Sequence, residues 1–118
     1  MDRRSFLAGA VLAAPAVAQI AGEKKPLRVG LIGAGARGTY LADTTAKMGE
    51  QGEPVQLAAV CDLYQPRLER AEVKYKAKGY AKTADMLRDA QLDAVMIATP
   101  DRQHILNTLE AIRAGKDV

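Results

Sequence analysis

Cysteine and aromatic residues are scarce in this sequence. It has one cysteine and no tryptophan among 118 residues, and aromatic residues make up 4% of the chain. A single cysteine forms no internal disulfide, so the cysteine content does not distinguish an oxidising from a reducing compartment. The shortage of aromatic side chains removes the stacking surfaces on which single-stranded nucleic acids are bound.

An excess of charge of one sign is also missing. Lys and Arg number 17 against 14 Asp and Glu, which gives a net charge of +3, and removal of residues 1–18 would lower it to +2. That balance is too mild for a basic nucleic-acid-binding surface, so we expect no nucleic-acid partner. With 48% hydrophobic residues the chain can bury a core, although a domain of this size gains from a partner domain.

The N-terminal segment, residues 1–18, lacks an apolar run long enough to cross a membrane. Its apolar stretch begins at Phe6, is short, and is diluted by Gly9 and Pro15. A charged start, an apolar middle and small residues near the end are the three parts of an export signal. We therefore expect a cleaved signal peptide over residues 1–18 and no stable membrane span.

Two adjacent arginines indicate a particular export route. Arg3 and Arg4 are followed by Ser-Phe-Leu, which resembles the twin-arginine signal that carries folded proteins across a membrane. Ala16 and Ala18 stand in the register of a cleavage site. We predict export to the periplasm by this route, with a polar linker over residues 19–26. A general secretory signal and an uncleaved anchor are the alternatives.

Beyond the linker, buried-strand patterns alternate with amphipathic helical patterns. Strands are expected over 27–32, 55–61 and 93–98, with a short edge strand at 80–81 and a new strand beginning at 118; helices are expected over 36–48 and 83–87, from 65 to a stop at Gly79, and from 101 to a stop at Gly115. Alternating strands and helices with short links predict a doubly wound, mostly parallel α/β sheet of the Rossmann type. Residues 27–118 would form this dinucleotide-binding domain.

The same patterns predict helix ends and packing faces. Gly49, Gly79 and Gly115 would follow three helices, with Gly79 as a left-handed cap, and Thr83 and Asp101 would cap the starts of two. Each helix is expected to pack one apolar face against the sheet. For the three longer helices these faces consist of Gly38, Leu41, Thr45 and Met48, of Leu68, Ala71 and Tyr75, and of Ile105, Leu109 and Ile112.

A glycine-rich turn joins the first predicted strand to the first helix. Gly33, Gly35 and Gly38 form GxGxxG, in which the first glycine permits a tight turn and the second lets a pyrophosphate approach. The third lets helix and strand pack closely. Unpaired amides at the helix start, around Ala36 and Arg37, would hold the anion. The alternative is a turn that only shapes this corner.

An acid follows the second predicted strand. Asp62 lies 24 residues after Gly38, and its carboxylate would accept hydrogen bonds from the adenosine ribose and repel an added phosphate. This favours NAD over NADP as the cofactor. The alternative is an aspartate that caps the next helix. Nearby, Arg37 and Tyr40 either reach the phosphates or are a solvated arginine and a packed tyrosine, and Cys61 is expected to be a core residue without chemistry.

Four stretches of the sequence resemble the Gfo/Idh/MocA oxidoreductases. They are RVGLIGAGARG, VCDLYQPRLERA, DAVMIATPDRQH and AIRAGKDV, and the resemblance covers residues 27–118. It implies that Thr99 and Pro100 lie under the nicotinamide end of the cofactor. His104 would order the neighbouring turn or touch the cofactor rather than transfer a proton. Asp101 departs from the asparagine that is common after this Thr-Pro pair in the family.

The family's catalytic part lies outside this sequence. In the family a lysine within a Glu-Lys-Pro segment is catalytic and a second α/β domain holds the substrate, whereas the resemblance stops at Val118. We therefore expect a front part of a longer enzyme, with no catalytic residue and no metal site of its own. A sugar-like substrate and a homo-oligomer would belong to the longer protein.

The leading interpretation is the cofactor domain of an exported oxidoreductase that moves hydride between NAD and a sugar or polyol. Such an enzyme should bind its cofactor before export and retain it tightly, because nicotinamide cofactors are not freely available outside the cytoplasm. The alternatives are an NAD-using glycoside hydrolase of related fold and a non-catalytic nucleotide-binding module whose sheet edge a partner would cover. Thr99, Pro100 and His104 disfavour S-adenosylmethionine as the ligand.

Overall fold

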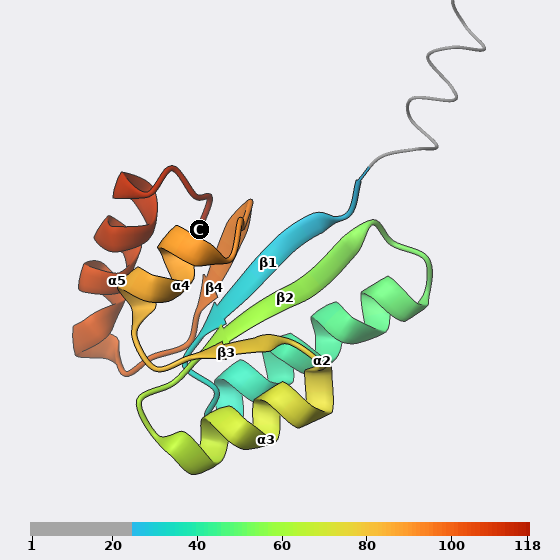
Figure 1. Ribbon diagram of the computed structural model, residues 1–118, viewed down its shortest axis with the longest axis horizontal. Coiled ribbons are helices and arrows are strands. Elements are labelled where there is room, and N and C mark those ends of the chain that lie inside the picture. Colours follow the sequence, from blue (N-terminus) through green and yellow to red (C-terminus); the bar gives the residue numbers. More distant parts are fainter. Residues whose placement is uncertain (1–24) are drawn as a thin grey trace, which may run out of the picture.

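A computed structural model describes residues 25–118, so the predicted signal peptide and residues 19–24 of the predicted linker lie outside the described part. Within it, strands and helices alternate and confirm the predicted α/β fold (Figure 1). The strands are β1 (Leu27–Ile32), β2 (Val55–Cys61), β3 (Lys78–Tyr80) and β4 (Ala94–Ile97), and the helices are α2 (Ala36–Glu50), α3 (Gln65–Tyr75), α4 (Thr83–Asp89) and α5 (Asp101–Arg113). The bounds of β1 and β2 agree with the prediction, while β3 begins earlier and β4 is shorter than predicted.

The strands run parallel in one sheet with the order β3-β2-β1-β4. The chain adds β2 and β3 on one side of β1 and then crosses to place β4 on the other side. The strand order therefore reverses between β1 and β4, which is where doubly wound sheets bind ligands at the carboxyl ends of their strands. A parallel bridge between Ala94 and Asp117 brings the chain back beside β4, where the sequence predicts a further strand.

Helices cover both faces of the sheet, α2 and α3 on one side and α4 and α5 on the other (Figure 1). Leu31 and Ile32 are buried in different clusters because successive strand residues point to opposite faces. The α2–α3 side buries Leu31, Ala34, Ala42, Leu57, Val60, Leu68, Ala71 and Ala77, and the α4–α5 side buries Ile32, Ala59, Cys61, Tyr80, Met86, Leu87, Ala90, Leu92, Val95 and Ala111. Of the predicted α2 face, Gly38 and Thr45 are buried, whereas Met48 is exposed.

Two predicted helix ends are wrong. α2 continues past Gly49, and the left-handed glycine that follows it is Gly52, with a φ of 92°. α3 ends well before Gly79 because Lys76 adopts the left-handed conformation, with a φ of 51°. Gly79 instead lies in β3, where a Cβ atom would collide with the side chain of Glu72. Its lack of a side chain therefore serves packing between α3 and β3 rather than helix termination.

The predicted caps at Thr83 and Asp101 are also wrong. Both residues lie inside their helices, behind the N-cap residues Lys82 and Pro100, and neither helix start has a side-chain capping hydrogen bond. Asp101 still places a negative charge in the first turn of α5, where the helix dipole favours it. Gly115 follows α5 with a φ of 76°, as predicted.

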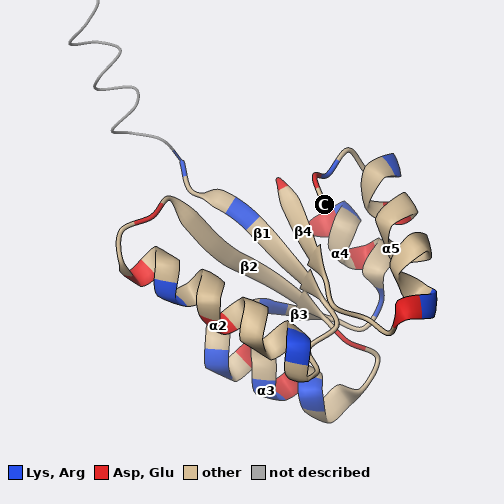
Figure 2. Cartoon of the chain, turned by 180° about the vertical axis from the view of Figure 1, so that it is seen from behind, with Lys and Arg blue, Asp and Glu red and all other residues tan. Residues whose placement is uncertain are grey.

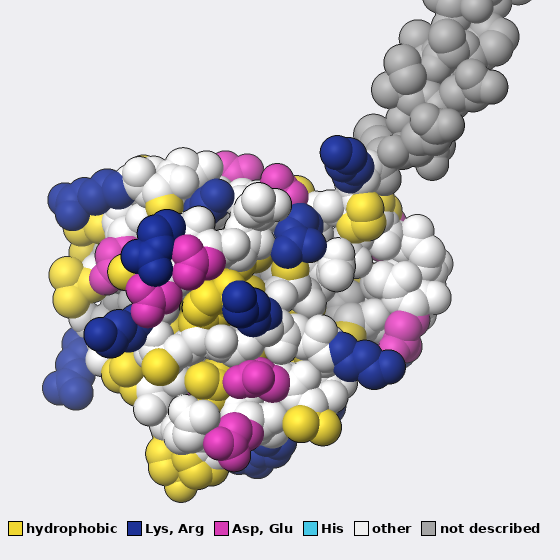
Figure 3. Space-filling model, in the orientation of Figure 1, with side chains coloured by type: hydrophobic (Ala, Val, Ile, Leu, Met, Phe, Trp, Pro, Cys, Tyr) yellow, Lys and Arg dark blue, Asp and Glu magenta, His cyan; other side chains and the backbone are white. Residues whose placement is uncertain are grey.

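The apolar stripe of α5 faces outward rather than toward the sheet. Ile105, Leu109 and Ile112 are 72%, 41% and 58% exposed, and Leu106 beside them is also exposed (Figure 3). The buried residue of this helix is Ala111. The prediction was wrong because periodicity identifies the residues that share a helix face but not the neighbour which that face meets.

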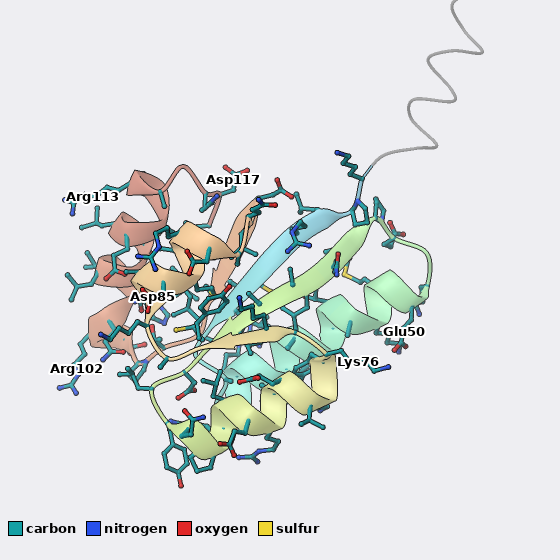
Figure 4. All side chains as sticks on the ribbon, viewed as in Figure 1. Glu50, Lys76, Asp85, Arg102, Arg113 and Asp117 are labelled. Carbon is teal, nitrogen blue, oxygen red and sulfur yellow. The ribbon has the colours of Figure 1, made fainter. Side chains whose placement is uncertain are left out.

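The remaining surface carries charges of both signs. Lys and Arg are interspersed with Asp and Glu on α2 and α3 (Figure 2). Arg102 and Arg113 point away from the sheet at the two ends of α5 (Figure 4). Among residues 25–118, no helix combines the length and the apolar character that crossing a membrane requires.

A cluster of three polar side chains joins α2 to α3. The Oδ1 atom of Asp43 accepts a hydrogen bond from the Tyr75 hydroxyl at 2.6 Å and lies 2.8 Å from Lys74 Nζ. Hydrogen bonds from Lys74 and then Tyr75 hold the pKa of Asp43 below its ordinary value. Asp43 and Lys74 are both half-exposed, so water screens the pair and we expect only a small contribution to stability.

This cluster predicts a small dependence of stability on pH. Because the folded-state pKa of Asp43 is lowered, its contribution is complete above the ordinary value of 3.8 and disappears as the pH falls through the lowered value. Asp43→Asn should therefore reduce the free energy of unfolding at about pH 7 but not at about pH 2. Urea denaturation at both pH values measures this, with Glu53→Gln as the control, because Glu53 is exposed in the loop before β2 and its side chain forms no ion pair within residues 25–118. An equal loss at both pH values would contradict the assignment.

Candidate functional site

The glycine-rich loop lies between β1 and α2, at the carboxyl edge of the sheet. Gly33 has a φ of 94°, and a Cβ atom on it would lie 2.8 Å from the carbonyl carbon of Ala98. A Cβ atom on Gly38 would overlap the carbonyl oxygen of Gly33. The first glycine therefore permits the turn, and the third allows α2 to begin directly against the end of β1.

The second glycine leaves the start of α2 open. Gly35 is the N-cap residue, and no side chain caps this helix. The first helical hydrogen bond runs from Thr39 N to the Gly35 carbonyl at 2.8 Å, so the preceding amides have no acceptor inside the helix. A Cβ atom on Gly35 would meet only Arg67 Nη1, at 3.6 Å. Free amides, the positive helix end and this space fit a pyrophosphate group.

Asp62 connects the glycine-rich loop to the loop after β2. It is 9% exposed, and its Oδ2 atom accepts a hydrogen bond from the Ala34 amide at 2.9 Å. Its Oδ1 atom accepts one from the Tyr64 amide at 2.8 Å. The Arg67 Nε atom lies 3.4 Å from Oδ2. Asp62 makes no side-chain capping bond to α3, whose N-cap residue is Tyr64, so the capping alternative is wrong.

The turn after β4 is ordered by side chains of α5. The Thr99 hydroxyl donates a hydrogen bond to Asn107 Oδ1 at 2.7 Å. The His104 Nε2 atom lies 2.5 Å from the Thr99 carbonyl oxygen, which can only accept, so Nε2 carries the proton. His104 is thereby bonded to the backbone, in keeping with the expectation that it orders this turn. The Asn107 and His104 side chains thus hold the turn at Thr99 in place.

These loops surround a cavity of about 620 Å³. Five predicted site residues line it: Gly33, Gly35, Asp62, Thr99 and Pro100. Ala36, Arg37, Gly38 and His104 lie outside its lining; Gly38 is buried beneath the loop. Residues that the sequence analysis did not assign to the site also line it, namely Ile32, Cys61, Leu63, Arg67, Ala81, Thr83, Ala98, Gln103, Leu106, Asn107 and Glu110.

The expectations for Tyr40 and for Cys61 have different outcomes. Arg37 lies over the ring of Tyr40, with its guanidinium carbon 5.2 Å from the ring centroid. Tyr40 is 62% exposed, so the alternative of a packed tyrosine is wrong. Cys61 is buried as expected, and burial raises the pKa of its thiol. Its sulfur atom lies 3.8 Å from the Thr83 hydroxyl, which is uncharged and does not activate it as a nucleophile.

Some of the cavity-lining residues that the sequence analysis did not assign could have been predicted from the sequence. Arg67 follows Asp62 by slightly more than one helical turn along the chain, a spacing that is visible in the sequence. The contact of Asp62 with the Ala34 amide has no such signal, because it depends on how β1 and β2 are aligned in the sheet. Leu106 and Asn107 reach the cavity only through the position of α5.

Comparison with known proteins yields a family match over the whole domain. The profile described as "Oxidoreductase family, NAD-binding Rossmann fold" matches residues 27–118. The inositol 2-dehydrogenase 1 of Saccharopolyspora erythraea is 32% identical over 92 residues, which cover 78% of this chain and 27% of that protein. A glycosyl hydrolase family 109 protein of Shewanella baltica is 31% identical over 107 residues, which cover 82% of this chain and 22% of that protein.

A solved structure shows the same domain with a cofactor. The WlbA dehydrogenase from Bordetella pertussis, in complex with NADH and UDP-GlcNAcA, matches with a TM-score of 0.74 and 29% identity. The match covers 80% of this chain and 28% of that chain. This chain therefore spans about a quarter of the length of the relatives that it matches.

The geometry at Gly38 and Gly35 predicts that an added methyl group reduces stability at the first position and cofactor affinity at the second. Gly38→Ala should reduce the free energy of unfolding by about 1–3 kcal/mol, because its methyl group overlaps the Gly33 carbonyl. Gly35→Ala should leave stability nearly unchanged, because its φ of −75° suits any residue, but should weaken NAD⁺ binding by filling the space beside the free amides. Thermal unfolding and calorimetric titration measure the two effects. Equal behaviour of the two variants would contradict this division of roles.

Proposed function

The chain belongs to the Gfo/Idh/MocA oxidoreductase family as an NAD-binding Rossmann domain, and we propose that it is the cofactor domain of an exported enzyme that oxidises or reduces a sugar or polyol. The observation that carries the proposal is the shared cavity. It brings Gly33, Gly35 and Asp62 together with Thr99 and Pro100 at the point where the strand order reverses.

Each part of the cavity has a distinct role in binding the dinucleotide. The open amides at the start of α2 would hold the pyrophosphate, and Asp62 would accept hydrogen bonds from the adenosine ribose. Thr99 and Pro100 would border the nicotinamide end, held in place by Asn107 and His104. When bound, NAD supplies the hydride acceptor for the reaction. The residues of this chain bind and orient it, and a longer protein would supply the substrate-binding part.

The substrate class is inferred from relatives. The matched Saccharopolyspora protein is an inositol dehydrogenase, and a D-xylose 1-dehydrogenase (NADP(+)) of Hypocrea jecorina is 37% identical over 51 residues. Inositol and xylose are both polyhydroxylated carbon chains or rings. A sugar or polyol is therefore the substrate class that we assign to the full-length enzyme.

Export through the twin-arginine route is part of the same proposal. Arg3, Arg4 and the cleavage-site register at Ala16 and Ala18 support it. An enzyme exported in folded form can carry its cofactor with it. The cofactor would then have to stay bound through many turnovers, because it would not be replaced outside the cytoplasm.

A second candidate function is glycoside hydrolysis with a tightly held NAD. The match to the Shewanella glycosyl hydrolase family 109 protein covers more of this chain than the match to the inositol dehydrogenase. Such a reaction oxidises the sugar transiently and restores the cofactor before the product leaves. Both candidates use the same cofactor site.

Location and cofactor retention can be tested in one measurement. Native mass spectrometry of the protein from the periplasmic fraction of its source cells should detect a chain without residues 1–18 that carries a dinucleotide. Replacing Arg3 and Arg4 by Lys should prevent its appearance there, because the twin-arginine pathway depends on this pair. A periplasmic protein that carries no nucleotide and binds none on addition would overturn the proposal.

The two enzymatic candidates differ in whether the cofactor is changed at the end of the reaction. An oxidoreductase should reduce bound NAD⁺ when sugars or polyols are added, and the near-ultraviolet absorbance of the reduced nicotinamide should then increase. A hydrolase should release nitrophenol from nitrophenyl glycosides with no net change in the cofactor. We expect the native enzyme to show the first behaviour, and release of nitrophenol alone would support the hydrolase instead.

A further inference from the structure

The helix α5 presents a mostly polar face to the cofactor cavity. The residues of this helix that line the cavity share one side of it, because they follow the first of them by three, four and seven positions. They are Gln103, Leu106, Asn107 and Glu110. The apolar stripe described above lies on another side of the helix and is exposed. Polar side chains on the cavity side suit hydrogen bonding to a ligand.

Glu110 is the one charged residue of this polar face. Within residues 25–118 its carboxylate forms no ion pair. Asn107, by contrast, already accepts a hydrogen bond from the Thr99 hydroxyl. An ionised carboxylate accepts hydrogen bonds and donates none. Glu110 therefore offers the cavity an acceptor that no cation of the described part neutralises.

The position of Glu110 along the cavity is close to the start of α4. It also lines the groove between α4 and α5, together with Ala84 and Leu87. Burial raises the pKa of the Cys61 thiol, and the charges of Asp62 and Glu110 add to this rise. The Glu110 carboxylate is thus within electrostatic range of the end of β2. Because α4 follows β3, Glu110 lies at the β3 side of the cavity.

The proposed cofactor geometry directs the base of the dinucleotide to the same side. The glycine-rich loop follows β1, Asp62 follows β2 and Ala81 follows β3, and these strands are neighbours in that order. A dinucleotide with its pyrophosphate beside Gly35 and its ribose on Asp62 therefore extends toward the end of β3. Leu63 and Leu106 line the cavity with exposed apolar side chains, which suit the faces of a base.

We propose that Glu110 selects adenine as the base of the dinucleotide by accepting a hydrogen bond from its exocyclic amino group, an inference that rests on the proposed cofactor function. This amino group is a donor on the edge of adenine. A hydrogen bond from it to a carboxylate is charge-assisted. Hypoxanthine carries a carbonyl oxygen at the same position, and this acceptor is repelled by a carboxylate. The site should therefore prefer NAD to nicotinamide hypoxanthine dinucleotide, which differs from NAD only in the base.

The test is the ratio of two affinities. Dissociation constants of NAD⁺ and of nicotinamide hypoxanthine dinucleotide are measured by calorimetry on the full chain and on Glu110→Gln. The full chain should bind NAD⁺ about tenfold more tightly, since adenine alone supplies the charge-assisted hydrogen bond. Glu110→Gln should largely remove this preference, because a neutral carboxamide pairs with an amino group or with a carbonyl oxygen. The control Glu50→Gln, at the exposed end of α2 (Figure 4), should keep it.

Four results would overturn the inference. Equal affinities of the full chain for the two dinucleotides would show that the edge of the base is not recognised. A preference that persists in Glu110→Gln would assign the recognition to another group. An equal loss of both affinities in this variant would assign Glu110 to the placement of α5. The same loss of preference in Glu50→Gln would assign the effect to net charge. By contrast, a chain that is folded by circular dichroism but binds neither dinucleotide would contradict the proposed function itself.

Discussion

The contact between the start of α2 and the end of β1 is the constraint on which the site depends. Gly38 lies so close to the Gly33 carbonyl oxygen that no side chain fits between them. Because α2 begins there, its unpaired amides and its positive end point toward the carboxyl edge of β1 and β4. The same arrangement brings the Ala34 amide to Asp62. This packing contact thus places the open end of α2 near Asp62, whose own position depends on how β1 and β2 are aligned.

Asp62 has a structural role in this arrangement, besides the binding role that we propose for it. A buried carboxylate is costly unless hydrogen bonds or an opposite charge compensate for lost hydration. Two backbone amides and Arg67 provide this compensation, and they come from three segments: the glycine-rich loop, the turn after β2 and α3. The acid therefore holds the walls of the cavity together before any ligand binds. A ligand at the ribose position enters a site whose charges are already balanced.

The two faces of the sheet are not covered equally. On the α2–α3 side, both helices pack buried residues against the sheet, among them Ala42 and Leu68, and the Asp43 cluster joins the two helices. On the other side, α4 buries Met86 and Leu87, whereas α5 buries Ala111 and leaves its apolar stripe on the surface. The cofactor cavity lies at the boundary between the two sides, so the turn at Thr99 relies on α5 for its hydrogen bonds.

Features with a local cause were determined by the sequence alone. The bounds of β1 and β2, the turn at Gly33, the close packing at Gly38 and the place of Asp62 after β2 follow from apolar runs, backbone sterics and a short spacing. Each of these features depends on residues that are close together in the sequence, so the sequence pattern is enough to predict it. Even among local features, the pattern selected Gly79 as a helix end, although Lys76 adopted the left-handed conformation.

Features that require two distant surfaces to meet were decided only by the tertiary structure. The Ala34–Asp62 hydrogen bond, the Arg67 side chain against Gly35 and the outward stripe of α5 all depend on strand register and helix rotation. Register and rotation are set by the packing of the whole sheet with its helices, because side-chain volumes on opposing elements must fit together. A periodic pattern records which residues share a face, whereas only the packed structure decides what that face contacts.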